Sequence, residues 1–489
     1  MDTIIGRQRE LTLLDTLWQR PAAALLIVYG RRRVGKTSLL VHWLQQRGVR
    51  ALYWVAEPSS TYDQLRAFSQ ALYTFANPDT PPPPAFTYAT WEQALDQVAA
   101  LARQTRLALL LDEFTYLLAN DPALAGVFQN AWDHRLRHSQ LLLVLCGSHL
   151  GMLERYALAY QAPLYGRATA QLRVEPLPFS ATRAYFPGYD AAERVAIYAL
   201  FGGIPAYWER LDPQRSIAEN IRRELLTPNN LMQAEPRLLL YDFVREPGNY
   251  VAILRAIAHG RRTQQEIGRF TGLAQGHASR YLSVLQEAGF VERRVPVTAE
   301  PDSRLGRYHI TDPYLRFYYR FLAARQTQLA LGIDEPALAE VQRHLLDYIG
   351  TYTWEELGRE WVLRAGAAGQ VPFLADQVGS AWTKTAQVDV VGINRMEKTL
   401  ILGECKWSPR PMGIEVLTDL AGKAASIVPA QGMWRVLFVG LARGGWQPEA
   451  IRWAQSAAAQ NLSGPHWRTT GWQLVDLAQL DADLAAWTP

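Results

Sequence analysis

The sequence predicts an α/β protein built from about three domains. Its 489 residues are enough for that many domains of ordinary size. In the first half, continuous apolar runs of strand length are followed by helical segments, which is typical of a parallel sheet buried on both faces. Strands and helices alternate again towards the C-terminal end. With 49% hydrophobic and 20% charged residues, a disordered, collagen-like or small disulfide-rich protein is excluded.

Cysteine usage and the first residues predict the compartment. Cys146 and Cys405 both lie in apolar runs, and two cysteines are too few for a disulfide framework or a zinc site. The first seven residues lack a basic segment followed by an apolar one, and no apolar run approaches the roughly 20 residues that span a bilayer. We therefore expect a reduced, cytoplasmic protein without membrane contact.

The two basic residue types are used very unequally. The net charge is only +4, but the chain holds 45 arginines against five lysines, and Lys36 is the sole lysine among the first 383 residues. Codon bias explains the arginines equally well, so only the exceptions are informative. A lysine kept in such a chain suggests a position that needs a compact ammonium group rather than a planar guanidinium.

A phosphate-binding loop is predicted after the first apolar run, residues 24–29. Gly30, Gly35, Lys36 and Thr37 fit the pattern GxxxxGK[ST] between a strand and a helix. The glycines let backbone N–H groups turn towards phosphate, Lys36 would reach the β- and γ-phosphates, and Thr37 would ligate magnesium. The alternative is a chance glycine-rich turn.

Two further apolar strands end in polar residues. Residues 107–111 precede Asp112 and Glu113. Asp112 would hold magnesium through water, and Glu113 would polarise the attacking water. Residues 141–146 precede Gly147 and Ser148, and ligands of open α/β sheets bind at the carboxyl ends of the strands. Ser148 could therefore sense the γ-phosphate or position water. A solvated turn at the acidic pair and a helix cap at Ser148 are the alternatives.

The order of these motifs resembles that of the AAA+-like ATPases common in archaea, a group related to the signal-transducing STAND ATPases. It begins at residues 6–11 and runs through the phosphate loop, the acidic pair, Gly147-Ser148 and residues 166–167 to residues 202–205. The resemblance implies a P-loop parallel sheet with a helical lid over residues 1–240, ATP and Mg²⁺ as cofactors, and a homo-oligomer, for example a hexameric ring.

The same resemblance implies roles for residues outside the phosphate loop. Gly6 and Arg7 would lie near the adenine, and Pro205 in the lid beside the nucleotide. Arg167, just before the strand expected at residues 170–176, would be an arginine finger that reaches the γ-phosphate of a neighbouring subunit; an ordinary surface arginine is the alternative. The run of three arginines at residues 31–33 is expected on a solvated or phosphate-near face, without a catalytic role.

The middle segment carries the positive charge. Residues 249–325 contain 12 arginines and six acidic residues, so this stretch has charge +6 and the remainder −2. The pattern predicts a helix over 250–258 and then a capping box from Thr263 to Glu266. A second helix is expected over 275–288, with Tyr281, Leu282 and Leu285 buried, and a hairpin framed by 289–295 and 306–310 follows it.

This pattern resembles a winged helix-turn-helix, placed at residues 245–325. The expected DNA-contacting residues of its recognition helix are Gln275, His277, Ser279 and Arg280. Those of its wing are Arg293, Arg294, Arg304 and Arg307. The functional interpretation is binding of duplex DNA through phosphate contacts, and the alternative is a lid or a protein-docking module.

Two carboxylates and a lysine meet in the C-terminal part. Residues 388–393 and 399–407 form a predicted hairpin, in which Glu404 and Lys406 share a face and Asp389 lies on the neighbouring strand. Two carboxylates can hold one hard divalent cation, and a lysine beside it can orient a nucleophile, which is what phosphodiester hydrolysis needs. The alternative is an ordinary hairpin with a surface salt bridge.

The setting of this hairpin resembles the PD-(D/E)xK restriction-endonuclease-like fold over residues 345–445, with a preceding helix at 354–362, a helix at 413–428 and a strand at 434–441. The resemblance implies an α/β nuclease-like domain at 330–489, with Asp389, Glu404 and Lys406 at a Mg²⁺ or Mn²⁺ site. It implies Glu355 as the helix carboxylate, in competition with Glu356 and Glu360. Residues 446–489 have no predicted place.

Together these parts predict an ATPase that controls a metal-dependent nuclease on DNA. A non-enzymatic alternative is a STAND-type DNA-binding switch or scaffold whose nuclease-like domain only binds. A toxin-like ribonuclease is a third possibility, and cleavage assays on DNA and RNA with ATP and divalent metal separate the three.

Overall fold

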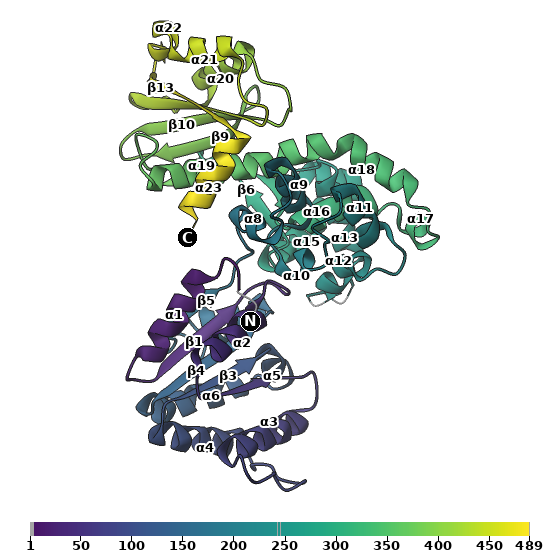
Figure 1. Cartoon of the computed structure of the whole chain (residues 1–489), viewed down its shortest axis with the longest axis vertical. Helices are drawn as coiled ribbons and strands as arrows, with labels where there is room; N and C mark the ends of the chain where they lie inside the picture. The colour runs from purple at the N-terminus through teal and green to yellow at the C-terminus, as the bar shows by residue number, and fades with distance from the viewer. Residues whose placement is uncertain (1–3, 242, 245, 489) are drawn as a thin grey trace. The chain divides into compact units, whose positions relative to one another are not determined.

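The structure is a computed structural model that describes residues 4–241, 243–244 and 246–488. The chain divides into two compact units (Figure 1). The first runs to Leu177 and includes Ile204–Tyr207, and the second comprises Pro178–Gly203 and the chain from Trp208 onwards. The domains predicted at 1–240, 245–325 and 330–489 remain a prediction. The second compact unit contains both the helices after Leu177 and the chain that follows residue 207.

A five-stranded parallel sheet in the order β2-β3-β4-β1-β5 forms the centre of the first unit. Its strands are β1 (Ala24–Tyr29), β2 (Ala51–Val55), β3 (Leu107–Asp112), β4 (Leu141–Gly147) and β5 (Ala170–Arg173). The strands β3 and β4 are buried along their whole length, which confirms the parallel α/β prediction. Only β5 differs, because it ends three residues before the predicted end of that strand.

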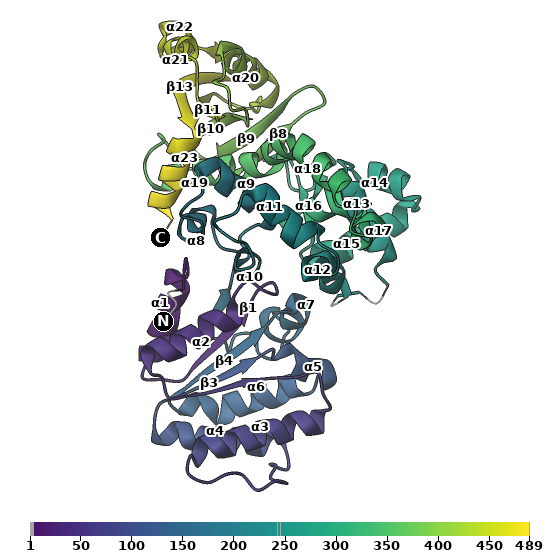
Figure 2. The ribbon, with the colours of Figure 1, turned by 45° about the vertical axis from the view of Figure 1, so that its right-hand side comes forward.

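Helices cover both faces of this sheet. The cluster of apolar side chains on one face joins the strands to α3, α4, α5 and α6, while α1 and α2 lie on the other side (Figures 1 and 2). The helices of this unit are α1 (Gln8–Gln19), α2 (Lys36–Arg47), α3 (Thr61–Ala76), α4 (Trp91–Gln104), α5 (Thr115–Asn120), α6 (Leu124–His134) and α7 (Leu150–Leu153), with short turns η1 (Leu136–His138) and η2 (Glu154–Leu158).

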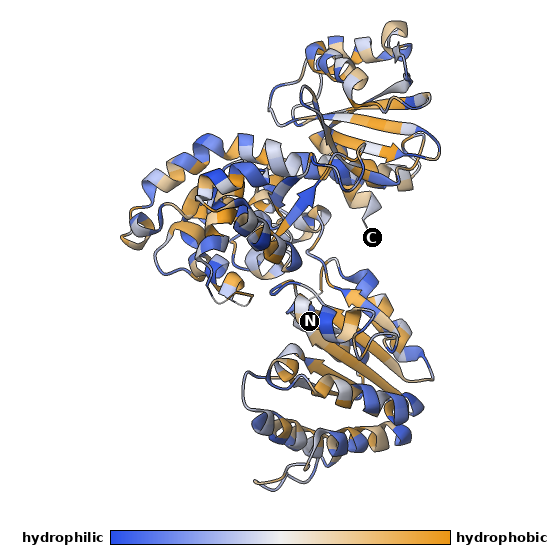
Figure 3. Cartoon of the chain, turned by 180° about the vertical axis from the view of Figure 1, so that it is seen from behind, coloured by the Kyte–Doolittle hydropathy of each residue, from blue (hydrophilic) through white to orange (hydrophobic). Residues whose placement is uncertain are grey.

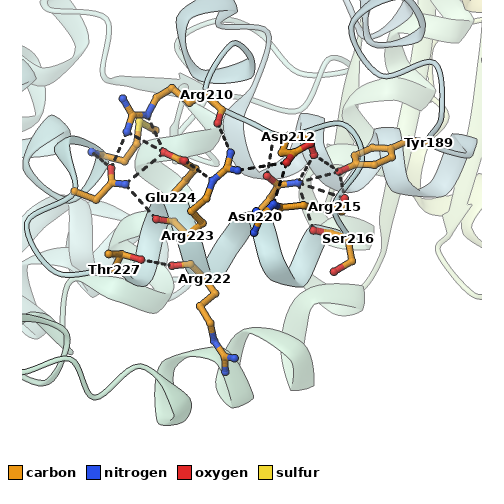
Figure 4. Close-up of polar contacts among 12 residues, drawn as sticks. Tyr189, Arg210, Asp212, Arg215, Ser216, Asn220, Arg222, Arg223, Glu224 and Thr227 are labelled. Carbon is orange, nitrogen blue, oxygen red and sulfur yellow. Dashed lines mark hydrogen bonds and ion pairs between the residues drawn. The ribbon is translucent and has the colours of Figure 1, made fainter.

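The second unit opens with short helices. They are η3 (Phe179–Ala181), α8 (Thr182–Tyr185), α9 (Ala191–Phe201), α11 (Ile217–Ile221), η4 (Arg222–Leu226) and α12 (Leu231–Tyr241), while α10 (Pro205–Trp208) bridges the two stretches. A buried polar network fixes α11 and η4 (Figure 4). Asn220 is fully buried and donates to the Tyr189 hydroxyl and the Asp212 carbonyl oxygen, both at 2.9 Å, and Arg210 pairs with Glu224 at 2.9 Å. These bonds hold helices that are too short to be stable alone.

The winged helix has the predicted order of elements. They are α13 (Gly248–Ala258), α14 (Gln264–Thr271), α15 (Gln275–Glu287), β6 (Val291–Arg294) and β7 (Arg307–Ile310). Both bonds of the predicted capping box from Thr263 to Glu266 are present. On α15, Leu282 and Leu285 are buried as predicted, but Tyr281 is only half-buried. Ala278 takes the third core position, because it lies one helical turn before Leu282 on the same face.

The C-terminal part forms a mixed sheet in the order β12-β13-β11-β10-β9-β8. Helices η5 (Tyr318–Leu322), α16 (Pro313–Phe317), α17 (Gln326–Ala330), α18 (Glu335–Tyr348) and η6 (Ile349–Trp354) precede it. Its own elements are α19 (Glu355–Ala367), β8 (Gln377–Trp382), β9 (Gln387–Asn394), β10 (Thr399–Lys406), α20 (Ile414–Ile427) and β11 (Trp434–Ala442). This is the predicted α-β-β-β-α-β order.

Residues 446–489, which the sequence left without a place, complete this sheet. They form α21 (Pro448–Gln455), α22 (Ala457–Gln460), β12 (Ser463–Gly464), β13 (Trp467–Asp476) and α23 (Leu477–Trp487). The strand β13 pairs in parallel with β11 along its length. On α23, the buried Asp481 pairs with Arg194 and, at 2.7 Å, with Arg183, so this tail also ties the sheet domain to α8 and α9.

Apolar side chains gather on the strands of both sheets (Figure 3). In the C-terminal sheet, Leu420, Ala424 and Ile427 of α20 pack against one face, and α19 and α23 contact the chain on the other side of the strands. Across the part of the chain that the structure describes, every helix is too short or too polar to cross a membrane.

Candidate functional site

The phosphate loop leaves the carboxyl end of β1 in a conformation that only glycines adopt easily. Gly30 has φ of 152°, and a Cβ there would lie 2.5 Å from the Val174 carbonyl oxygen. Gly35 has φ of 93° and precedes the first residue of α2, whose N-terminus receives no side-chain cap. The loop therefore ends with the open N–H groups that bind phosphate at helix N-termini.

Lys36 lies inside this loop rather than in an ion pair. Its Nζ donates to the carbonyl oxygens of Gly30 at 2.9 Å and Arg31 at 3.0 Å. The side chain is buried, and burial lowers the pKa of its ammonium group. A cation held only by neutral carbonyls is ready to exchange them for the oxygens of an anion.

Asp112, at the end of β3, is held by hydroxyl groups. Its Oδ2 accepts from the Thr37 hydroxyl at 2.6 Å and from the Tyr53 hydroxyl at 2.7 Å. Burial alone would raise the pKa of this carboxyl, but these hydrogen bonds outweigh burial and hold its pKa below the usual value. The structure thus brings together Thr37 and Asp112, the two predicted magnesium ligands.

Tyr53 is a site residue that the sequence did not reveal. It lies on β2, whose strand pairing with β3 places it opposite Leu110 and near Asp112. Burial and then the Asp112 carboxylate raise the pKa of its hydroxyl, which stays protonated and donates. The available signal is a tyrosine in an apolar strand, and this signal is weak until the neighbouring strand is known.

Glu113 and Ser148 face one another across the ends of β3 and β4. The Ser148 hydroxyl donates to Glu113 Oε2 at 3.0 Å, and Glu113 has φ of 50°, an uncommon left-handed backbone conformation for this residue. The cap of the following helix α7 is His149, whose Nδ1 accepts from Met152 N–H at 3.3 Å. The capping alternative for Ser148 is therefore taken by its neighbour, and Ser148 orients the candidate catalytic glutamate.

The residues expected around the nucleotide also contact the loop. Arg7 is buried and donates to the Val34 carbonyl oxygen at 2.7 Å, directly after Gly6, which has φ of 67°. Pro205 lies against the loop, since its Cγ would be 3.8 Å from a Cβ at Gly35. All of these residues belong to the first compact unit.

The face expected to be solvated or phosphate-near at residues 31–33 is half-buried, and two of its arginines have protein partners. Arg31 donates to the Tyr207 hydroxyl at 2.9 Å, and Arg32 donates to the Tyr116 hydroxyl at 3.0 Å. Both side chains are half-buried. These arginines therefore brace the loop against α5 and α10.

Arg167 is engaged within its own chain. Its guanidinium forms a two-pronged contact with Asp133 at 2.8 and 2.9 Å and donates to the Pro163 carbonyl oxygen at 2.9 Å. This contact holds the pKa of the Asp133 carboxyl below its usual range. A finger that reaches a neighbouring subunit would first have to leave Asp133, so the role of Arg167 in trans stays a prediction.

The C-terminal domain brings three carboxylates together. Asp389 on β9 accepts from the Cys405 N–H of β10 at 3.1 Å, and burial followed by the charge of Glu404 raises its pKa. Burial and then Asp389 raise the pKa of Glu355, at the start of α19, to about 8. The hairpin therefore places Asp389 beside Glu404, as predicted from the sequence.

The three glutamates expected to compete as the helix carboxylate differ in their partners. Glu356 pairs with the buried Arg316 at 3.0 Å, and Glu360 pairs with Arg364 at 2.8 Å. Glu355, in contrast, interacts electrostatically with Asp389, and burial followed by the charge of Asp389 raises its pKa. In the described chain, however, no group of three or more His, Cys, Asp or Glu side chains is arranged to hold a metal ion.

Two lysines bind the third carboxylate. Glu404 is buried, and its Oε1 accepts from Lys406 at 2.7 Å while its Oε2 accepts from Lys423 at 2.9 Å. Lys423 also pairs with Asp419 one helical turn earlier on α20, at 2.9 Å. The sequence signal for Lys423 was its rarity, since it is one of five lysines, but only the packing of α20 on β10 shows its partner.

The recognition helix and the wing differ in exposure. The four predicted contact residues of the recognition helix all lie on its exposed face, namely Gln275, His277, Ser279 and Arg280. In the wing, Arg304 is exposed, but Arg293 bonds to the carbonyl oxygen of Ser303.

Two wing arginines contact the C-terminal domain. Arg294 pairs with Glu356 at 3.3 Å, and Arg307 donates to Gln387 at 3.0 Å and lies 4.4 Å from the Trp382 ring centroid. The DNA role of these two arginines stays a prediction. The structure gives both a docking role, because the guanidinium group of each contacts a residue of the C-terminal domain.

Three sequence families match parts of the chain. Residues 4–211 match an ATPase domain found predominantly in Archaea, and residues 247–301 match the MarR family. Residues 318–415 match archaeal and bacterial proteins of unknown function. The N-terminal part of this chain is an archaeal-type ATPase domain. Its P-loop site, a MarR-type winged helix and a mixed-sheet C-terminal domain follow one another in the order that the structure shows.

Two proteins of known sequence are similar to parts of the chain. The chain is 27% identical to an uncharacterized protein of Methanocaldococcus jannaschii over 406 residues, which is 82% of this chain and 87% of that protein. An uncharacterized ATP-binding protein of the same organism is 41% identical over 46 residues, covering 9% of this chain and 78% of that protein.

Solved structures give weaker likenesses. The Cdc6p structure from Pyrobaculum aerophilum is 14% identical with a TM-score of 0.35, covering 70% of this chain and 96% of that one. The ORC2 structure from Aeropyrum pernix is 12% identical with a TM-score of 0.39, covering 70% and 98%.

Proposed function

We propose that this chain is an ATP-dependent DNA-binding and DNA-processing protein, in which the archaeal-type ATPase domain controls a metal-dependent nuclease in the C-terminal domain. The observation that carries the nuclease part is the meeting of Asp389, Glu404 and Lys406 on paired strands, with Glu355 beside them. The ATPase part is supported by the family match and by the geometry around Lys36.

In ATP hydrolysis, the residues of the phosphate loop would bind and orient the triphosphate. Lys36 would exchange its two carbonyl partners for β- and γ-phosphate oxygens, and Thr37 and Asp112 would hold magnesium. The metal would supply charge neutralisation on the transferred phosphoryl group. Glu113, kept in place by Ser148, would orient the attacking water and accept its proton.

Coupling between ATP and the rest of the chain would pass through residues 204–207. This segment belongs to the first unit, where Pro205 lies against Gly35 and Tyr207 accepts from Arg31, while the chain on both of its sides belongs to the second unit. A change of the phosphate loop on ATP binding would therefore pull on a segment connected covalently to the second unit at two points.

In the nuclease reaction, Asp389 and Glu404 would supply hard oxygen ligands to one Mg²⁺ or Mn²⁺. Their donor set fits such a cation, because Mg²⁺ is commonly held by one or two carboxylates and keeps its remaining waters. The metal would activate water and neutralise charge on the phosphodiester. Lys406 would orient the nucleophile, and Glu355 would complete the acidic side of the site.

DNA would bind first through the recognition helix of the MarR-type winged helix. Its four polar residues are exposed, and the segment around it has charge +6. Arginine contacts with phosphate release counterions from DNA, which makes the affinity depend on salt. The DNA-binding contribution of Arg280 is the part of this proposal that a single substitution tests.

The decisive experiment incubates the full chain with duplex, single-stranded and branched DNA and with RNA, each with and without ATP and with Mg²⁺ or Mn²⁺. We expect metal-dependent DNA cleavage that Asp389→Ala and Glu404→Ala abolish, while ATP turnover continues. DNA binding without any cleavage would favour a STAND-type switch or scaffold. Cleavage of RNA alone, without affinity for duplex DNA, would indicate a ribonuclease.

The proposed homo-oligomer, for example a hexameric ring, is tested through Arg167. If Arg167 acts on a neighbouring subunit, a mixture of Arg167→Ala and Lys36→Ala chains regains ATP turnover at interfaces that pair an intact finger with an intact loop. A mixture as inactive as the separate variants leaves Arg167 with its observed contact to Asp133.

A further inference from the structure

Glu404 carries two ammonium partners in a chain that uses lysine only five times. Lys406 reaches it from the same strand and Lys423 from α20, at 2.7 and 2.9 Å. The two lysines donate to different oxygens, so each oxygen of the carboxylate has an ammonium partner. A compact ammonium group suits this arrangement, since it is a point charge on a flexible stem.

The charges at this site match those of a divalent cation. Glu404 brings a buried carboxylate and Asp389 a half-buried one, and Lys406 and Lys423 together bring two positive charges. Buried carboxylates need such compensation, because an isolated charge away from water is strongly unfavourable. The lysines therefore provide the compensation that a bound metal would provide in their place.

Lys423 differs from Lys406 in having an alternative partner. Asp419 lies four residues earlier on α20 and accepts from the same ammonium group at 2.9 Å, and its side chain is 65% exposed. Glu404, in contrast, is only 5% exposed. Lys423 can thus give up its buried partner and keep its exposed one, with a small movement of a long side chain.

We propose that Lys423 is a positioning residue that competes with the divalent cation for Glu404. In the absence of metal it neutralises Glu404; when Mg²⁺ or Mn²⁺ binds, its ammonium group leaves Glu404 and keeps Asp419 as its partner. This inference rests on the proposed metal site of the C-terminal domain. Its physical basis is the repulsion between an ammonium group and a divalent cation that share one carboxylate.

The test measures Mn²⁺ affinity of the full chain by isothermal titration calorimetry, without DNA or ATP. Lys423→Met keeps the length of the side chain and removes its charge, so we expect Mn²⁺ to bind about tenfold more tightly. Lys384→Met removes one charge from an exposed turn of the same domain, and this matched control should change the affinity by less than about twofold.

A second pair of variants keeps the test valid if Lys423→Met does not fold. Asp419→Asn removes the alternative partner, so Lys423 stays on Glu404 and Mn²⁺ should bind about threefold more weakly. Lys423→Arg keeps the charge, so its affinity should stay close to that of the unchanged protein. A merely structural role of Lys423 would not produce opposite effects at positions 423 and 419.

The outcomes separate this inference from the proposed function. If the unchanged protein binds Mn²⁺ and Asp389→Asn removes that binding, the metal site stands. Unchanged or weaker binding by Lys423→Met then overturns the role of Lys423 alone. If neither the unchanged protein nor Lys423→Met binds Mn²⁺, the metal site and the competition by Lys423 both fall.

Discussion

The two candidate sites both contain lysines and carboxylates, but the charged groups have different kinds of partners. At the phosphate loop, Lys36 is held by neutral backbone carbonyls and Asp112 by neutral hydroxyl groups. In the C-terminal domain, Glu404 is neutralised by two ammonium groups. The difference teaches that a site prepared for an anion keeps its cation on uncharged partners, whereas a site with buried carboxylates needs internal cations until another cation arrives.

The largest expected effect breaks the first site alone. Lys36→Ala removes the only lysine in the sequence of the first unit, so ATP turnover should fall by a factor of about 100 or more. Glu113→Gln should still bind ATP while hydrolysing it slowly. Phosphate release assays and nucleotide titrations measure both effects, and normal turnover of the Lys36 variant would contradict the assignment of the loop.

The raised pKa of Glu355 in the second site should make the stability of the protein depend on pH. The pKa of Glu355 is raised from 4.5 to about 8, so the native state holds a proton that the unfolded state releases. Its contribution to stability is complete below pH 4.5 and is lost as the pH rises through 8. Glu355→Gln stays neutral, so its free energy of unfolding should fall less between pH 5 and pH 9, by roughly 2 kcal/mol.

Urea denaturation at both pH values measures this difference. Glu360→Gln on the same helix is the control, because the partner of Glu360 is Arg364 rather than Asp389. Equal pH dependence of the unchanged protein and of the Glu355 variant would mean that this carboxyl is not held neutral in the folded chain.

A smaller effect sharpens the account of the first site. Tyr53→Phe removes one hydroxyl that donates to Asp112 and leaves the ring in place. One hydrogen bond from a hydroxyl group to a carboxylate is worth about 1–2 kcal/mol, so ATP turnover should fall about fivefold to thirtyfold at low magnesium. Tyr116→Phe, which loses a contact to Arg32 instead, is the matched control. An unaltered magnesium dependence in the Tyr53 variant would show that Thr37 alone suffices.

The smallest effect concerns the charges of the winged helix. Arg280→Ala should lower the slope of DNA affinity against salt by about one unit, because an exposed phosphate contact is lost. Arg294→Ala should leave the slope unchanged and lower the melting temperature, since Arg294 pairs with Glu292 and Glu356. A loss of slope at Arg294 would restore the wing as a DNA-contacting element.

Local order in the sequence explains why much of the first site was predictable. Lys36 and Thr37 come after the loop that leaves β1, and Asp112 and Glu113 stand at the end of β3, so parallel strands bring them to one edge of the sheet. Tyr53 escaped prediction because its contact depends on which strand pairs with β3. Lys423 escaped because a helix residue meets Glu404 only after α20 has packed on the sheet.

The sequence by itself determined the apolar strands, the glycine positions of the phosphate loop, the capping box at Thr263 and the order of elements around Asp389 and Glu404. These features depend on neighbours within a few residues, where backbone geometry and side-chain periodicity act directly. Only the tertiary structure decided that Arg294 and Arg307 dock on the C-terminal domain and that Lys423 joins Glu404. Such contacts join residues far apart in the chain, so their energies depend on packing that no local pattern encodes.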